Sequence, residues 1–247
     1  MTAKELYERI CSSNYCTAFT GAGVSTLSGI PDFRGKNGLY NDPVFSKDAD
    51  KIFDLNYFKK DPSLYYKSAS ALRYNFHDKT PSVIHIVLAE LEKKNIIKAI
   101  ITQNIDMLHE KAGSKNIIEL HGSPKVHYCL YCENVKMDYE DALAVIKKGE
   151  MPLCPNCGKV LKPGITFFGE MLPVKALEDA QKEAEKSDLM LVLGTSLSVY
   201  PAASIPQFTL AKGGSIIIIN NMPTHLDMYA EALFTDLGEV FDELNRS

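Results

Sequence analysis

The sequence lacks the features that would place this protein on nucleic acid or in a membrane. Its 247 residues include 27 basic and 31 acidic side chains, a net charge of −4, and no dense run of lysine and arginine. Surfaces that bind nucleic acid are normally basic, so we expect no direct nucleic-acid partner. No stretch reaches the roughly 18 uncharged apolar residues of a membrane span, and the opening MTAKELYERI has no apolar segment typical of a signal peptide. We therefore expect a cytoplasmic protein with no membrane partner.

Short apolar runs alternate along the chain with segments of helical periodicity. Strand-like runs cover residues 15–20, 96–104, 117–120, 165–170, 189–196 and 215–221, and helical patterns cover residues 3–13, 63–76, 81–94, 173–187 and 201–212. Strands that are apolar throughout and alternate with helices favour a parallel sheet covered on both faces. We predict a Rossmann-type, doubly wound α/β domain from residues 1–123 and 163–247, with a cofactor loop and helices inserted at about 25–95. Thr80 as a cap and Pro81 in the first turn would begin the helix at 81–94.

Four of the six cysteines form two CxxC pairs separated by twenty-one residues. Two such pairs are typical of a structural Zn²⁺ site with four thiolate ligands, here Cys129, Cys132, Cys154 and Cys157. Disulfide bonds and a redox-active CxxC are the alternatives, but a cytosolic protein keeps its thiols reduced, and redox CxxC motifs usually come singly. We predict a small inserted zinc-binding module at residues 124–162. Cys11 and Cys16 are interpreted as small buried apolar residues.

Small and polar residues follow the predicted strands at their carboxyl ends. In a doubly wound sheet these ends border one crevice, which is where such sheets bind ligands. The first strand leads into a turn whose glycines let backbone amides approach a pyrophosphate. The residues expected at the crevice are Gly21, Ala22, Gly23, Gln103, Asn104, Ile105, Asp106, His121, Gly194, Thr195, Ser196, Asn220 and Asn221.

The glycine turn departs from the fingerprint of the dinucleotide-binding dehydrogenases. Thr26 replaces the third glycine of G-x-G-x-x-G, and no acidic residue on a following strand lies about twenty positions later. The next clear strand begins only near residue 96, later than an ordinary dehydrogenase returns to its sheet. Hydride transfer is therefore disfavoured, and we expect the segment from 25 to 60, which contains GIPDFRG, to lie beside the nucleotide.

Seven motifs occur in an order that resembles one enzyme family. They are GAGVSTLSGIPDFRG, TQNIDMLHEKAG, ELHGS, the double CxxC, FFGE, GTSLSVYPAA and INN. Together they make the chain, from about residue 10 to 240, similar to the sirtuins, the NAD-dependent protein-lysine deacylases, and most like their bacterial or archaeal members. The resemblance implies that NAD is consumed. The amide oxygen of an acyl-lysine attacks C1′ of the nicotinamide ribose, nicotinamide leaves, and an alkylimidate collapses to lysine and acyl-ADP-ribose.

The resemblance also implies which residues do this chemistry. His121 matches the catalytic histidine, the base for a ribose hydroxyl, and imidazole titrates in the range that the task needs. A structural histidine is the alternative. Asn104 and Asp106 match the positions that contact the nicotinamide ribose and carboxamide, so Asn104 joins His121 as a catalytic residue. Asp106 could instead cap a helix that starts at Met107, and both roles can coexist.

The segment after the glycine turn matches the family's flexible cofactor loop. Ser25 would contact the pyrophosphate or a ribose, with helix capping as the alternative. Ile30, Asp32 and Phe33 would lie against the cofactor, where Phe33 would shield the reacting ribose from water. Arg34 would reach a phosphate; the alternative is a surface turn with a solvated arginine.

Later motifs match the other half of the NAD site and the substrate channel. Gly194, Thr195 and Ser196 match the adenosine-side loop, Asn220 and Asn221 match the strand end at the adenine ribose, and Asp236 matches a further adenine contact. Phe168 would line an apolar channel for the lysine stem, opposite Phe33 and His121. Core packing is the alternative for Phe167 and Phe168, one of which should face inward on an alternating strand. The backbone of this segment and that of LSVYPAA would pair with the substrate peptide.

We expect the partner to be an acetylated lysine of a protein substrate. The desuccinylating branch of the family carries a Tyr-x-x-Arg pair whose arginine binds the acyl carboxylate, and Ala69 and Leu72 occupy those positions here. The sequence therefore predicts a deacetylase with poor activity on succinyl-lysine. ADP-ribosyl transfer to a protein side chain and a non-catalytic reader of NAD or acetyl-lysine stay open as alternatives. A monomer is the default expectation.

Overall fold

The computed structural model describes residues 1–32, 38, 49–71 and 76–246. Contacts divide the chain into two compact units, which we call unit 1 and unit 2. Unit 1 comprises Met1–Asp32, Lys79–Leu120 and Leu172–Ser247, and unit 2 comprises Phe33–Asp78 and His121–Met171. Residues 124–162 thus share a unit with the helices of residues 49–71. The domain boundaries at residues 123 and 163 stay a prediction.

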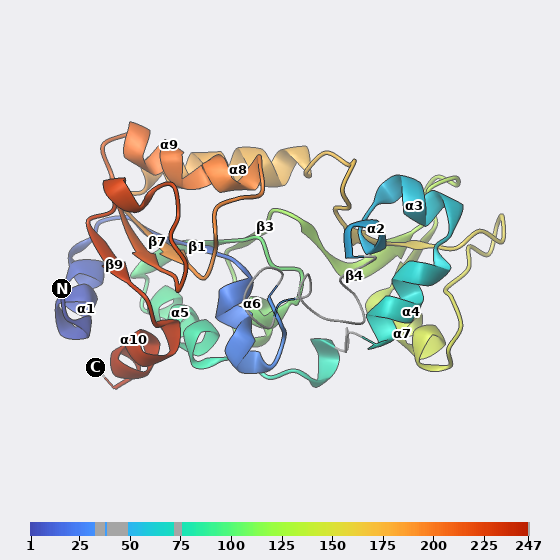
Figure 1. The fold of residues 1–247 in the computed structure, drawn as a ribbon, viewed down its shortest axis with the longest axis horizontal. Coiled ribbons are helices and arrows are strands. Elements are labelled where there is room, and N and C mark those ends of the chain that lie inside the picture. The colour runs from blue at the N-terminus through green and yellow to red at the C-terminus, as the bar shows by residue number, and fades with distance from the viewer. Residues whose placement is uncertain (33–37, 39–48, 72–75, 247) are drawn as a thin grey trace. The chain divides into compact units, whose positions relative to one another are not determined.

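Unit 1 contains a parallel sheet of six strands within the described residues (Figure 1). The strand order is β3–β2–β1–β7–β8–β9, and every neighbouring pair is parallel. The strands are β1 (Cys16–Thr20), β2 (Ile97–Thr102), β3 (Ile117–Glu119), β7 (Leu189–Leu193), β8 (Ser215–Ile219) and β9 (Ala232–Phe234). From β1 the chain adds β2 and β3 on one side of the sheet, and it then adds β7, β8 and β9 on the other side of β1. This order is the doubly wound one that the Rossmann fold requires, so the predicted fold class is confirmed.

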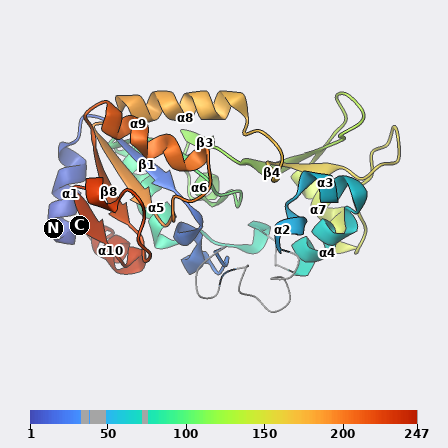
Figure 2. The same cartoon turned by 45° about the horizontal axis from the view of Figure 1, so that its top comes forward.

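Helices cover both faces of this sheet (Figure 2). One face carries α1 (Ala3–Ser12), α5 (Val83–Lys93) and α10 (Leu237–Leu244), and the other carries α8 (Val174–Lys186) and α9 (Ile205–Ala211). Shorter helical segments connect them: η1 (Ala22–Ser28), α6 (Leu108–Lys111), η4 (Ala202–Ser204) and η5 (Asp227–Tyr229).

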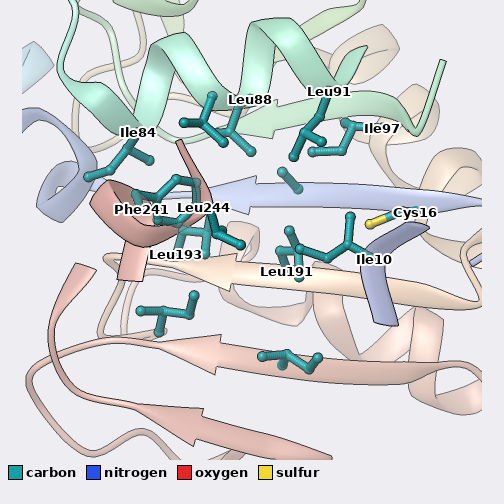
Figure 3. Packing of buried hydrophobic residues seen from close by; sticks show 14 of the residues in the cluster. Ile10, Cys16, Ile84, Leu88, Leu91, Ile97, Leu191, Leu193, Phe241 and Leu244 are labelled. Atoms are coloured by element: carbon teal, nitrogen blue, oxygen red, sulfur yellow. The ribbon is translucent and has the colours of Figure 1, made fainter. Parts of the chain in front are cut away.

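Side chains of the central strands enter two apolar clusters in alternation. On β7, Leu191 belongs to one cluster, and its neighbours Met190 and Val192 belong to the other. Figure 3 shows the first cluster, in which Leu88 of α5 and Phe241 of α10 pack against the strands. Because both faces are buried, these strands are apolar at every position, and this is why the sequence predicts them well.

The start of α5 differs from the prediction. Ser82, and not Thr80, is the N-cap, and Pro81 lies before the helix rather than in its first turn. The Ser82 amide donates to Nδ1 of His85 at 3.2 Å, and the Ser82 hydroxyl donates to the carbonyl oxygen of Val24 at 2.8 Å. Serine caps a helix as well as threonine does, and the bond to η1 selects the later residue.

Unit 2 is built on a separate antiparallel sheet with the order β5–β4–β6. Its strands are β4 (Gly122–Tyr128), β5 (Lys136–Asp138) and β6 (Lys162–Ile165), and its helices are α2 (Ala49–Ile52), α3 (Leu55–Lys60), α4 (Ser63–Ala71), η3 (Phe76–Asp78) and α7 (Tyr139–Lys147). The strand predicted at 165–170 is wrong, because only Ile165 belongs to a strand and Phe168 makes an isolated bridge to Asp54. The segment turns at Gly169, where φ is +90°, so it cannot continue as a strand.

In the described part of the chain, no helix is both long enough and apolar enough to cross a membrane.

Candidate functional site

Two glycine turns, one after β1 and one after β7, interlock at the switch point of the sheet, where the strand order changes direction. The Gly21 amide donates to the carbonyl oxygen of Leu193, and the Gly23 amide donates to that of Gly194, both at 2.9 Å. A Cβ atom on Gly23 would lie 2.7 Å from the Cα atom of Gly194, and Gly194 itself has a φ of +59°. Glycine is therefore required for one backbone to approach the other. Ala22, between the two glycines, begins η1 and is half-buried.

A polar network follows the turn and links the ends of β1 and β2. The side-chain amide of Asn104 donates to the Gly21 carbonyl oxygen at 3.0 Å and to Oγ of Ser25 at 3.2 Å. The Ser25 hydroxyl in turn donates to Oδ2 of Asp106 at 2.6 Å. The structure thus brings together three predicted site residues, and Ser25 connects the other two from within η1 rather than capping a helix.

Asp106 is buried and satisfied. Its side chain is only 5% exposed, and Oδ1 accepts the Leu108 amide at 2.9 Å. The capping alternative is therefore partly right, although the N-cap of α6 is Met107, in the left-handed conformation. Burial raises the pKa of Asp106, while the hydrogen bonds from Ser25 and Leu108 act in the opposite direction. The carboxyl group is held in one orientation beside Asn104.

A second link joins the ends of β2 and β7. Nε2 of Gln103 donates to the hydroxyl of Thr195 at 2.9 Å, and the same hydroxyl accepts the Leu197 amide at 3.2 Å. The Ser196 hydroxyl pairs with that of Ser198 at 2.8 Å. Ile105, two residues after Gln103, is half-buried. Gln103 therefore orients the turn that follows β7.

The predicted adenine-side residues follow β8 and β9. Asn220 directly follows β8, and its side-chain amide donates to the Met222 carbonyl oxygen at 2.7 Å; Asn221 is exposed. Asp236 is the N-cap of α10, and its Oδ1 accepts the Glu239 amide at 2.9 Å. Asp followed three residues later by Glu is a readable capping pattern. The capping role of Asp236 was not predicted.

Two residues of the predicted cofactor loop can be placed. The Ile30 amide donates to the Ser25 carbonyl oxygen at 3.2 Å, and Asp32 is half-buried at the end of this segment of unit 1. Phe33 and Arg34 lie outside the described residues.

His121 is the first residue of its segment of unit 2. Its neighbour Leu120 donates its amide to the Thr102 carbonyl oxygen of β2 at 2.9 Å, and the carbonyl oxygen of His121 accepts the Thr166 amide at 2.8 Å. The following Gly122 has a φ of +68° and passes so close to Gly164 that a Cβ atom would lie 2.2 Å from its oxygen. Glycine is therefore required directly after His121.

Phe167 and Phe168 differ in exposure as expected, although they lie in a turn and not on the predicted strand. Phe167 is 1% exposed and Phe168 is 48% exposed. The Phe168 amide donates to the Phe53 carbonyl oxygen at 2.7 Å, and the Phe168 carbonyl oxygen accepts the Leu55 amide at 3.0 Å. Backbone pairing of this segment with a peptide, as predicted, would therefore have to use residues other than Phe168.

The four predicted metal ligands gather in unit 2. The Sγ atoms of Cys129, Cys132, Cys154 and Cys157 all lie within 4.8 Å of one another, and those of Cys129 and Cys157 are 3.6 Å apart. Zn–S bonds of about 2.3 Å in a tetrahedron place the sulfur atoms about 3.8 Å apart, so the cluster fits Zn²⁺. All six cysteines are free thiols. Cys16 is buried as expected, but Cys11 is exposed on the outer side of α1, so that expectation was wrong.

Comparison with known proteins gives matches over most of the chain. The model of the Sir2 family matches residues 21–201. An NAD-dependent protein deacetylase of Thermotoga maritima is 42% identical over 227 residues, which cover 92% of this chain and 90% of that protein. A Sir2 structure with a deacetylated p53 peptide and 3′-O-acetyl ADP-ribose has a TM-score of 0.90 and 40% identity, covering 100% of this chain and 97% of that one. A Sir2 structure with a p53 peptide and NAD⁺ has a TM-score of 0.87 and 39% identity, with the same coverage. The chain belongs to the Sir2 family, the sirtuins.

Proposed function

We propose that this protein is an NAD-dependent protein-lysine deacetylase that transfers the acetyl group to ADP-ribose and releases nicotinamide. The observation that carries the proposal is the network of Asn104, Ser25 and Asp106 beside the interlocked glycine turns, at the switch point of a Sir2-family sheet. Its substrates are NAD and an acetylated lysine of a protein.

Asn104 is built to hold a ribose. Among the described residues, both hydrogen bonds of the Asn104 side chain use its nitrogen, so the oxygen Oδ1 would accept a hydrogen bond from a ribose hydroxyl. Asp106, fixed by Ser25, would hold the carboxamide of nicotinamide. These bonds would keep C1′ of the ribose in place when the acetyl-lysine oxygen attacks it and nicotinamide leaves with the bonding electron pair.

His121 would act as the base in the second half of the reaction. It would accept the proton of the ribose hydroxyl that attacks the alkylimidate carbon. Water then completes the release of free lysine, and the acetyl group remains on ADP-ribose. Gly21, Ala22 and Gly23 would lie against the pyrophosphate, with Ser196, Asn220 and Asn221 toward the adenosine.

The four cysteines would hold a Zn²⁺ ion with a structural role. A site with four thiolate ligands has no open position for water, so the metal would stabilise the segment between β4 and β6 and take no part in the chemistry.

Only the sequence supports a preference for acetyl-lysine over succinyl-lysine. The side chain of Ala69 and all of Leu72 lie outside the described residues, but neither residue type can pair with a carboxylate. We therefore retain acetyl-lysine over succinyl-lysine as the substrate. A monomeric state, a cytoplasmic location and the absence of nucleic-acid binding also remain proposals, the last supported by the net charge of −4.

Mass spectrometry tests the function. The purified protein is incubated with an acetyl-lysine peptide, with and without NAD, and with a succinyl-lysine peptide of the same sequence. Loss of the acetyl group only with NAD, matched by acetyl-ADP-ribose and nicotinamide, is the expected result. Nicotinamide release with an unchanged peptide and ADP-ribose on a protein side chain would instead establish the transferase, and the absence of any NAD turnover would contradict both.

A further inference from the structure

Lys162, at the start of β6, is a fully buried lysine that the reaction does not require. Its side chain has 0% exposure, and Nζ lies 2.8 Å from Oε2 of Glu170. The ammonium group also donates to the Ile165 carbonyl oxygen at 2.6 Å and lies 3.2 Å from Oη of Tyr128. The Pro163 carbonyl oxygen lies 3.2 Å from Nζ as well, so four acceptors surround the three N–H donors and the buried charge is satisfied.

Glu170 connects this charge to the turn that contains Phe168. Its Oε2 atom also accepts the Phe167 amide at 2.7 Å, and its own amide donates to the Phe167 carbonyl oxygen at 3.0 Å. Nζ of Lys162 lies 4.2 Å from the centre of the Phe167 ring, close enough for a cation–π contact. Lysine and glutamate together hold both ends of the turn 167–170.

A second set of contacts fixes the opposite side of the turn. The ring of Phe167 packs against Phe58 and Tyr65, with ring centres 5.5 and 5.3 Å away. The backbone of Phe168 is bonded to Phe53 and Leu55 on either side. With the backbone held in this way, the Phe168 side chain is directed outward, and almost half of its surface is exposed although it is a large apolar group.

Stability alone is a poor explanation for this arrangement. Replacing a buried ion pair with apolar residues of similar volume is often neutral or stabilising, because removing two charges from water is costly. A hydrogen-bonded ion pair fixes the positions of its two side chains, whereas apolar packing restricts side-chain positions less. The Lys162–Glu170 pair therefore fits a role in setting the position of the turn.

We propose that Lys162 and Glu170 are positioning residues that hold Phe168 in place to contact the stem of the acyl-lysine substrate. They act through the turn 167–170 and touch neither substrate. This inference rests on the proposed function, in which Phe168 lines the lysine channel. It assigns the pair to binding of the peptide and not to binding of NAD.

The double variant K162M/E170Q tests the proposal. It removes both charges together, so neither is left buried and unpaired, and it roughly preserves volume. We expect the KM for an acetyl-lysine peptide to rise about 10-fold, since small displacements of positioning groups cost this much or more, while kcat and the KM for NAD change less than about twofold. The melting temperature is measured alongside, and K93M serves as the control because Lys93 forms an exposed pair with Glu90.

A cycle with F168A separates positioning from general loosening. If the pair acts through Phe168, adding K162M/E170Q to F168A should raise the peptide KM by less than about twofold further. An unchanged peptide KM in K162M/E170Q, an equal rise in the KM for NAD, or full additivity with F168A would each overturn the inference. Inactivity of the wild-type protein with NAD and acetyl peptide would refute the proposed function instead. The peptide dissociation constant, measured by fluorescence anisotropy, would then decide the inference by the same comparison of variants.

Discussion

Individual residues at the switch point make structural contacts in addition to the chemical roles proposed for them. The sequence predicts that Asn104 and Asp106 lie at one crevice, and the family resemblance implies that Ser25 contacts the cofactor; the structure joins the three residues by hydrogen bonds. The sequence does not predict that Ser25 is the connecting residue, because the contact joins η1 to the end of β2 across about eighty positions of the chain. Likewise, the glycines were predicted for phosphate binding, yet the close contact of Gly23 with Gly194 requires glycine even without a ligand.

Alanine at position 23 should destabilise the fold. Its Cβ atom would lie 2.7 Å from a backbone atom of Gly194, and backbone cannot move aside cheaply, so we expect G23A to lower the free energy of unfolding by about 2 kcal/mol. Urea denaturation followed by circular dichroism measures this. G238A is the matched control, because Gly238 lies in α10 and its added Cβ atom would meet only side-chain atoms, Oδ1 of Asp236 at 3.3 Å and Cδ1 of Leu27 at 3.4 Å, so it should destabilise the protein less than G23A. Equal stability of G23A and the wild type would contradict the close approach of the two turns.

Tyrosine at position 121 should remove activity without unfolding the protein. A tyrosine cannot take over as base near neutral pH, and general bases contribute about 10²–10⁴-fold to rate. We expect H121Y to lose deacetylation by this factor while its circular dichroism spectrum and zinc content stay unchanged. H225Y, which replaces an exposed histidine, should retain activity. Substantial turnover by H121Y would refute the role of His121.

A helix or strand could be predicted where its own residues carry the pattern, and not where its conformation depends on contacts with distant parts of the chain. The strands β1, β2, β7 and β8 are buried on both faces, so their apolar runs could be located from the sequence. The segments β4, β9 and α10 were not predicted. The strand β9, for example, has only three residues, and Leu233 within it is 53% exposed. The turn 167–170 was taken for a strand because its aromatic residues are typical of strands, while its geometry depends on Lys162 and on contacts with residues 53–55.

The segment between β4 and β6 should depend on zinc. The apolar cluster beside the four thiols is small, with Leu161 buried and Val135 and Met137 packed against it, so we expect metal binding to supply much of the folding free energy of this part. We expect C154A, or chelation of the metal, to increase amide hydrogen exchange over residues 129–161 and to remove deacetylation indirectly. C11A, which replaces an exposed thiol on α1, should change neither. Normal protection of these residues after complete metal removal would show that the site is not structural.

The stability of the whole molecule should fall in mild acid because it buries neutral histidines. In α5 and α6, the rings of His85 and His109 have centres 4.6 Å apart. Burial lowers the pKa of His85 to about 4 and that of His109 well below the usual range. In unit 2, burial lowers the pKa of His127 to about 4, with Lys162 acting in the same direction. Since the unfolded chain binds these protons near pH 6.5, it is favoured as the pH drops below that value.

The contribution of one such histidine can be isolated. Above pH 6.5, His85 is neutral in both the folded and the unfolded protein and contributes nothing to the pH dependence. At pH 5.5, protonation of His85 in the unfolded chain should lower the free energy of unfolding by about 1.4 kcal/mol. The variant H85Q lacks this titrating group. Between pH 7.5 and 5.5 its free energy of unfolding should therefore fall by about 1.4 kcal/mol less than that of the wild type, whatever the stability of the variant at pH 7.5. H225Q, which replaces an exposed histidine, should keep the wild-type difference. Parallel curves for H85Q and the wild type would mean that His85 is protonated in the folded protein, and the neutral packing of α5 against α6 would then be incorrect.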